Sequence, residues 1–164
     1  MDDKTCMVDI AKYFLDFLEG ESCGKCTPCR IGVHRMKEIL EKICSGNAVI
    51  DDMSLLESMA LHIKESALCG LGRTAPNPVL SALQYFREEF LSHILIKKCP
   101  AGTCKALITY AIAPDTCTGC GMCLKACPAG AISGEKKKPH TIDIAQCMKC
   151  NACMESCPSG AILT

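Results

Sequence analysis

The chain has 164 residues, enough for one ordinary domain or two small ones. Its 18 lysine and arginine residues balance 18 aspartate and glutamate residues, so its charge favours neither nucleic acid nor an anionic membrane surface as a partner. Sixteen cysteines inflate the hydrophobic fraction of 49%, and only four phenylalanines and three tyrosines are present, so we expect bound metal to supply part of the folding free energy.

Cysteine at this density occurs in secreted disulfide scaffolds and in metal-binding proteins. The first ten residues, MDDKTCMVDI, are acidic and lack the apolar stretch of a secretory signal. No apolar run approaches the length needed to cross a bilayer. Cysteines spaced by two residues in series suit metal ligands better than disulfides. We therefore expect a metal-binding protein of the reducing cytoplasm.

Residues 1–95 predict a small four-helix bundle. Apolar residues recur there at helical spacing in four segments joined by short connections. Gly20 and Gly46 are the expected ends of the first two helices, and Thr27 followed by Pro28 is typical of a helix start. The four predicted segments are 6–22, 26–46, 51–68 and 77–94.

The first cysteine motif is ESCGKCTPCR, in which Cys23, Cys26 and Cys29 are each separated by two residues. Lys25 and Arg30 add positive charge, which would stabilise thiolates and a net anionic cluster. The motif has no fourth cysteine nearby, so a fourth ligand must come from elsewhere in the chain.

Cys69 is the natural fourth ligand of this triad. It lies in the predicted turn between the third and fourth helices, next to Gly70 and Gly72. The alternative is that Cys69 is a small buried apolar residue without a ligand role.

Residues 96–105, IKKCPAGTCK, separate two modules and form a possible hinge. Cys99 and Cys104 lie in it, and His93 precedes it. With Cys44 at the end of the second helix, these residues predict a closed, tetrahedral Cys3His zinc site. The alternatives are an unligated buried pair and a surface pair that reacts with oxidants.

Two residues outside these sets receive simpler expectations. Cys6 lies on an amphipathic helix and is expected in the apolar core. His140 lies in a lysine-rich segment and is expected to face solvent.

Residues 106–164 contain the same cysteine motif twice, with intervals of two, two and three residues followed by proline. Three thiolates on one turn can hold three corners of a 4Fe-4S cube, and the fourth cysteine of each run ligates the other cluster. One cluster is thereby assigned to Cys117, Cys120, Cys123 and Cys157, and the other to Cys147, Cys150, Cys153 and Cys127. The alternative is a pair of structural zinc sites, which more often combine two two-cysteine knuckles.

Two segments beside these motifs, KALITYAIAP and KPHTIDIA, predict strands. The expected fold class is therefore α+β, with a helical bundle that carries one cluster followed by a small α/β domain that carries two.

The C-terminal part, residues 101–164, resembles the bacterial two-cluster ferredoxins through its duplicated cysteine motif. The resemblance implies a small α/β fold with pseudo-twofold symmetry that transfers one electron at a time at low potential.

The N-terminal part is similar to the NADH-oxidising flavoprotein subunit of complex I, through ESCGKCTPCR and LCGLGRTAPNPVLSAL. In that family these four cysteines hold a 4Fe-4S cluster in a C-terminal helical bundle. A two-cluster ferredoxin fused behind the bundle resembles the beta subunit of multimeric NAD(P)-linked iron-iron hydrogenases, including electron-bifurcating ones.

The family's glycine-rich FMN and nicotinamide site has no counterpart in this sequence. We therefore expect a C-terminal fragment that relays electrons between an upstream flavin site and a partner. The resemblance implies as partners a hydrogenase catalytic subunit, a small 2Fe-2S subunit and ferredoxin. The alternatives are a self-contained ferredoxin-like carrier, the corresponding module of a formate-linked NAD-dependent dehydrogenase, and a zinc-based interaction module.

Overall fold

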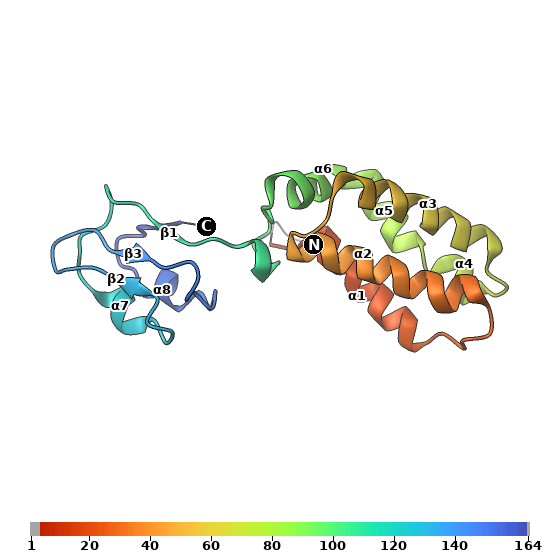
Figure 1. Cartoon of the computed structure of the whole chain (residues 1–164), viewed down its shortest axis with the longest axis horizontal. Helices are drawn as coiled ribbons and strands as arrows, with labels where there is room; N and C mark the ends of the chain where they lie inside the picture. Colours follow the sequence, from red (N-terminus) through yellow and green to blue (C-terminus); the bar gives the residue numbers. More distant parts are fainter. Residues whose placement is uncertain (1–3, 164) are drawn as a thin grey trace. The chain divides into compact units, whose positions relative to one another are not determined.

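The structure, a computed structural model, describes residues 4–163. The chain divides between Leu107 and Ile108 into two compact units (Figure 1), an N-terminal helical unit and a C-terminal unit with short strands. The expected α+β class is confirmed at this level. In the described part of the chain, no helix combines the length and the apolar character needed to span a bilayer.

The N-terminal unit contains six α-helices, two π-helical turns and one 3-10 turn within the described residues. These are α1 (Met7–Gly20), η1 (Pro28–Gly32), α2 (Val33–Ser45), α3 (Ile50–Ser66), α4 (Gly70–Thr74), α5 (Asn77–Tyr85), α6 (Arg87–Leu91), η2 (Ser92–Ile96) and η3 (Lys105–Leu107).

Helix α2 lies between α1 and α3 and contacts both (Figure 1). Its buried residues recur at helical spacing, so one continuous stripe enters the core. The helix ends at Gly46 in the left-handed conformation (φ 79°), where the Asn47 N–H bonds back to the Lys42 carbonyl. The buried stripe of α2 consists of Val33, Met36, Ile39, Leu40, Ile43 and Cys44.

The helical unit departs from four simple helices in two places. The segment predicted at 77–94 is interrupted at Phe86 (φ −128°, ψ 32°), which separates α5 from α6. Phe86 is 40% exposed, whereas Phe90 after the interruption is completely buried. The short helix α4 adds a further turn between α3 and α5, immediately after Cys69.

The C-terminal unit is built from two copies of one strand–helix–strand pattern, the second following the first by 30 residues. The first copy is β1 (Ala111–Ile112), α7 (Met122–Ala126) and β2 (Ile132–Ser133), and the second is β3 (Thr141–Ile142), α8 (Ala152–Glu155) and β4 (Ile162–Leu163). Each sheet is antiparallel and joins one strand of each copy, since β1 pairs with β4 and β2 with β3. The predicted strands thus exist but are much shorter than their segments.

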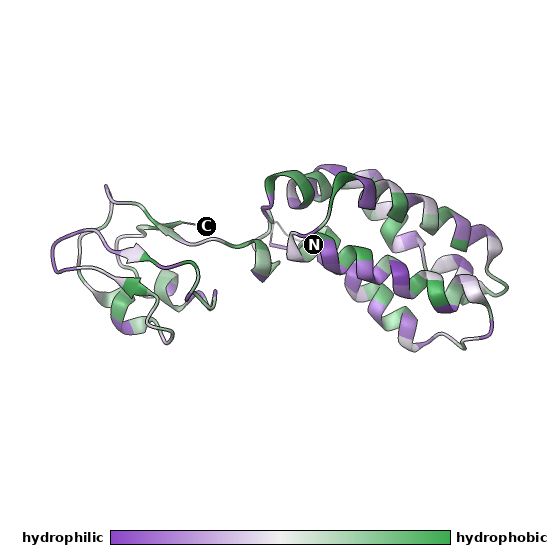
Figure 2. Cartoon of the chain, in the orientation of Figure 1, coloured by the Kyte–Doolittle hydropathy of each residue, from purple (hydrophilic) through white to green (hydrophobic). Residues whose placement is uncertain are grey.

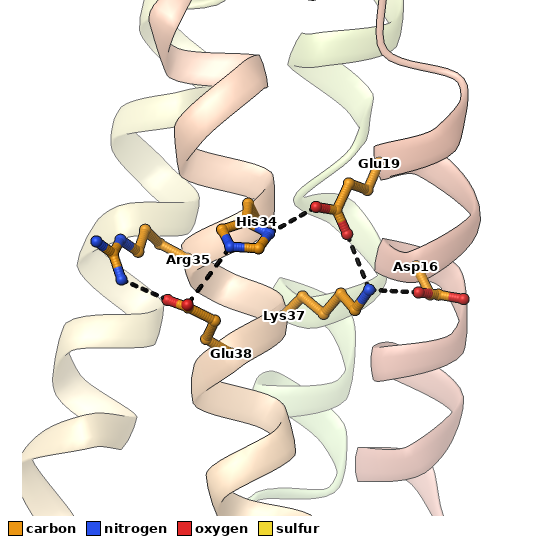
Figure 3. Close-up of polar contacts among 6 residues, drawn as sticks. All are labelled: Asp16, Glu19, His34, Arg35, Lys37 and Glu38. Atoms are coloured by element: carbon orange, nitrogen blue, oxygen red, sulfur yellow. Dashed lines mark hydrogen bonds and ion pairs between the residues drawn. The ribbon is translucent and has the colours of Figure 1, made fainter.

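Hydrophobic and hydrophilic residues alternate along the helices of the N-terminal unit (Figure 2), and almost all of its buried residues are apolar. On the outside, α1 and α2 are joined by a network of charged groups (Figure 3). The Lys37 ammonium lies 2.5 Å from the Asp16 carboxylate and 2.9 Å from Glu19 on α1. His34 Nδ1 lies 2.6 Å from a Glu19 carboxylate oxygen. Hydrogen bonds from Lys37 and His34 lower the pKa of Glu19.

Because the pKa of Glu19 is lower in the folded state, its contribution to stability is present above its unfolded pKa and is lost as the pH falls through the folded pKa.

We expect Lys37→Met to lower the thermal unfolding midpoint of the helical unit, and 1 M salt to shrink the effect because these groups are partly exposed. Circular dichroism at 222 nm on the full chain measures this.

Arg35→Met is the matched control, because Arg35 pairs only within its own helix with Glu38 among the contacts drawn in Figure 3. An equal loss in both variants would contradict a stabilising role for the contact between α1 and α2.

Candidate metal centres

The first triad lies at the start of the helix pair η1–α2. Cys29 is buried within η1, whereas Cys23 is exposed on the loop before it. The backbone N–H of Leu68, with that of Cys29, lowers the pKa of Cys26. The Leu68 contact brings the connection between α3 and α4 to the triad.

Cys69 directly follows this contact, as the residue that precedes α4. Gly72 in α4 packs on Cys29 so closely that a Cβ atom there would lie 3.3 Å from the Cys29 Cβ and 3.6 Å from its Sγ. The same Cβ would lie 2.7 Å from the Cβ of Ala67. The segment with Cys69 is therefore held against the triad at both of its ends, and only a hydrogen atom fits at position 72.

Both π-helical turns of the described chain carry a predicted ligand. Cys29 lies in η1 and His93 lies in η2. Such turns often occur at functional sites.

In the C-terminal unit, four predicted ligands line one pocket. Cys127 from the first repeat joins the triad of the second repeat there, and Tyr110 and Ile132 form part of the apolar wall. The second repeat's members of the pocket are Cys147, Cys150 and Cys153.

The other predicted set also gathers residues from both repeats. Burial raises the pKa of Cys123, and the nearby Cys117, Cys120 and Cys157 raise it further. Such crowding of four sulfurs disfavours four separate thiolates and would be relieved by a bound cation or cluster.

A fourth group lies in the N-terminal unit, and all of its members are buried. The Sγ atoms of Cys6, Cys99 and Cys104 and a ring nitrogen of His93 all lie within 4.8 Å of one another. Cys6 Sγ lies 3.8 Å from Cys104 Sγ and 3.4 Å from His93 Nε2. The group joins the start of α1, the end of the last helix and the segment that precedes η3.

The orientation of His93 is fixed by its own backbone. Its Nδ1 lies 2.7 Å from the Glu89 carbonyl oxygen, one helical turn earlier, which makes Nδ1 the protonated nitrogen and leaves Nε2 to face the sulfurs. Burial disfavours the imidazolium, but the contact with Cys6 outweighs it and raises the pKa of His93 to about 9.

Hydrogen bonding also redistributes protons among the sulfurs of this group. The contact with Cys104, aided by His93, outweighs burial and lowers the pKa of Cys6 to about 4. The contacts with Cys44 and Cys6 raise the pKa of Cys104. Cys6 and His93 therefore form a thiolate–imidazolium pair, and a divalent cation bound there would displace the proton from Nε2.

The group differs from the expected zinc ligands at one position. His93, Cys99 and Cys104 come together as expected, but the fourth member is Cys6 rather than Cys44. Cys44 instead lies within 4.8 Å of Cys104 and a carboxylate oxygen of Asp9, beside a cleft of about 280 Å³. The spacing of the cysteines does not indicate that Cys6 lies beside Cys99 and Cys104, because only the packing of α1 brings them together.

His140 also differs from its expectation. Instead of facing solvent it is 3% exposed, and its Nδ1 lies 3.9 Å from Cys117 Sγ.

All sixteen cysteines lie in the described part of the chain, and none of them forms a disulfide. The described chain therefore has three sets of predicted cluster cysteines and one buried group that includes histidine, besides the smaller group of Asp9, Cys44 and Cys104.

Two family models match these regions. Residues 9–93 match the NADH-ubiquinone oxidoreductase-F iron-sulfur binding region, and residues 116–161 match the 4Fe-4S dicluster domain.

Individual relatives agree with the family models. The chain is 54% identical over 140 residues to the NADP-reducing hydrogenase subunit HndC of Solidesulfovibrio fructosivorans, covering 85% of this chain and 29% of that protein. It is 38% identical over 105 residues to a subunit of the NADH-quinone oxidoreductase of Streptomyces coelicolor, covering 64% of this chain and 23% of that protein. It thus spans less than a third of the length of these relatives.

A solved structure shares part of the fold. A chain in the crystal structure of an NAD+-reducing [NiFe]-hydrogenase in the H2-reduced state matches with a TM-score of 0.55 and 33% identity, over 57% of this chain and 16% of that one. The first family model matches residues 9–93, which is more than half of the chain and includes the first cysteine triad. The chain therefore belongs to the family of the NADH-ubiquinone oxidoreductase-F iron-sulfur binding region.

Proposed function

We propose that the chain is the iron-sulfur relay of an NAD(P)-linked hydrogenase, with one 4Fe-4S cluster in its helical unit and two in its C-terminal unit. The observation that carries the proposal is the exchange of a cysteine between the two repeats. Cys127 lines the pocket of the second triad, and Cys157 lies near Cys123 of the first. This reciprocal arrangement is the ligand pattern of two-cluster ferredoxins.

In the helical unit, the proposed ligands are Cys23, Cys26, Cys29 and Cys69. The proposal is supported by the contact of Leu68 with Cys26 and by the packing of Gly72 against Cys29. A bound cluster supplies reversible one-electron redox chemistry. The protein contributes the ligands, the burial and the N–H groups directed at the sulfurs, which together set the potential.

The flavin and nicotinamide chemistry belongs, in this proposal, to a part of the longer protein outside this chain. The relay would pass electrons between that part and a hydrogenase subunit, a small 2Fe-2S subunit or ferredoxin. Support comes from relatives whose names include NADP-reducing hydrogenase and NADH-quinone oxidoreductase, of which this chain spans less than a third.

We further propose that Cys6, His93, Cys99 and Cys104 hold a structural zinc ion. A tetrahedral zinc ion with zinc–sulfur bonds of about 2.3 Å and zinc–nitrogen bonds of about 2.0 Å separates two sulfurs by about 3.8 Å, and a sulfur from a nitrogen by about 3.5 Å. The distances from Cys6 to Cys104 and to His93 Nε2, 3.8 Å and 3.4 Å, fit this geometry. Four protein ligands close the site, as is usual for structural zinc.

The zinc ion would fasten the segment that contains Cys99 and Cys104 to the first and last helices. A hydrogen bond from the Thr103 hydroxyl to the Lys4 carbonyl (3.1 Å) already joins this segment to the start of α1. The chain reaches the boundary at Leu107 three residues after Cys104. The C-terminal unit would therefore leave the helical unit from a fixed point.

Metal and sulfide analysis of the full chain, purified without oxygen, tests the whole assignment. We expect about twelve irons, about twelve acid-labile sulfides and about one zinc per chain, from three cubanes and one closed zinc site. About eight irons would contradict the cluster in the helical unit, and about twelve irons without zinc would contradict the zinc site.

The choice between Cys6 and Cys44 as the zinc ligand has a direct test. We expect Cys6→Ser to lose most of its zinc, because Cys6 is a member of the buried group, and Cys44→Ser to retain about one zinc per chain. Zinc is measured by mass spectrometry on the anaerobic full chain. Loss of zinc in Cys44→Ser with retention in Cys6→Ser would reverse the assignment.

The contact between α4 and the first triad gives a second test. Gly72→Ala should lower the iron content by up to about four atoms per chain, one cubane, because the new methyl group must displace Ala67 or Cys29. Gly70→Ala is the matched control, since a Cβ there meets nothing within 4 Å in the described residues. Equal iron contents in the two variants would contradict this packing constraint.

A further inference from the structure

His140 is a buried polar side chain beside a predicted cluster ligand. It is 3% exposed, it directly precedes β3, and its Nδ1 lies 3.9 Å from Cys117 Sγ. This distance is within the range of an N–H···S hydrogen bond, which is longer than one to oxygen. From the sequence, His140 was expected to face solvent and to have no role. A buried imidazole, however, requires a hydrogen-bond partner.

The ring occupies a space that a glycine provides. A Cβ atom at Gly134 would lie 2.6 Å from Cδ2 and 2.8 Å from Cγ of His140. Both contacts are far below van der Waals distance, so the imidazole fits only because position 134 has no side chain. Gly134 and the ring together form one packed unit at the edge of the β2–β3 hairpin.

The loop between Gly134 and His140 is docked on the first cysteine turn. The Lys137 N–H donates to the Gly119 carbonyl at 3.1 Å, between Cys117 and Cys120. Gly119 has φ 67°, and a Cβ there would lie 2.6 Å from the backbone nitrogens of Lys137 and Lys138. The loop is thus held over the turn by backbone contact, which fixes His140 at its base.

The second triad lacks both features, because the counterpart of His140 by the same offset of 30 residues is Tyr110, whose hydroxyl donates to Asn151 Oδ1 at 3.3 Å. Lys149 occupies the position equivalent to Gly119, 30 residues later, with φ 54° and a side chain where the first repeat has a hydrogen atom. His140 is the one histidine in residues 108–164 of the sequence. The two triads therefore differ in the donors around them although their cysteine spacing is the same.

We propose that His140 donates its Nδ1–H to the Cys117 sulfur and thereby raises the reduction potential of the cluster bound by Cys117 above that of its neighbour. This inference rests on the proposed cluster ligands. Reduction adds one electron and makes the cluster more negative, so a donor to a ligand sulfur stabilises the reduced form more than the oxidised form. No proton is transferred in this step, since the ring remains bonded to the sulfur in both states.

A difference in potential gives the electron a preferred resting place within the C-terminal unit. The first repeat would then be the acceptor end of the pair and the second repeat the donor end. One loop would thus give a direction to electron transfer between two clusters whose cysteine motifs are the same.

Redox titrations of the anaerobic full chain, monitored by electron paramagnetic resonance, test the proposal with His140→Phe and His140→Asn. In His140→Phe we expect one potential to fall by about 59 mV, a tenfold change in a one-electron equilibrium constant, and the others to stay. His140→Asn should recover at least half of the shift, because its side-chain amide can donate from nearly the same place as Nδ1. Lys136→Ala, an exposed change in the same loop, is the control and should shift no potential.

Full iron and sulfide content with unchanged potentials in His140→Phe would overturn the proposal. A deficit of iron in the wild-type chain would instead overturn the cluster assignment. If His140→Phe loses its cluster, pulsed spectra of the reduced chain with ¹⁵N-labelled histidine decide. A coupled ring nitrogen that vanishes in labelled His140→Asn supports the proposal, and its absence from the wild-type chain overturns it.

Discussion

The structure depends first on where each predicted cluster obtains its fourth cysteine ligand. A run of three cysteines on one turn cannot enclose a cubane, so the fourth ligand must come from a distant part of the chain. In the relay that we propose, each repeat of the C-terminal unit meets this constraint by lending one cysteine, Cys127 or Cys157, to the other repeat. The helical unit would meet it with Cys69, which lies beside the Leu68 contact to the triad.

This constraint accounts for the small apolar core of the C-terminal unit. Among the described residues, the apolar cluster of the C-terminal unit has five buried members, and two of them, Cys123 and Cys153, are cysteines of the triads. Its strands are two residues long, so the sheets alone would be marginal. In the relay that we propose, the clusters supply the missing cohesion, and folding and cofactor binding are coupled.

The sequence predicted the elements whose signals are local. Helical periodicity located the main helices, and Gly20 and Gly46 ended α1 and α2 where expected. The duplicated motif predicted which cysteines of the two repeats would gather, because the spacing itself limits the reach of the chain. The break at Phe86 has no proline or glycine to signal it and was not predicted.

Two features of the sites depend on tertiary packing and could not be read from spacing. Cys6 joins His93 only because the packing of α1 brings its start to the first residues of η2, although the two residues are 87 positions apart. His140 looked solvated because its neighbours are lysines, yet the absence of a side chain at Gly134 lets the ring turn inward. A glycine close to a histidine in a tight hairpin is the one local signal from which the burial of His140 could have been predicted.

In the relay that we propose, this one chain holds three redox-active centres and one redox-inert metal. A reductive titration of the anaerobic chain with quantified paramagnetic resonance tests it most directly. We predict an uptake of about three electrons per chain, one for each cubane, and none for the zinc ion. An uptake of about two electrons or fewer at full iron content would contradict a continuous relay through both units.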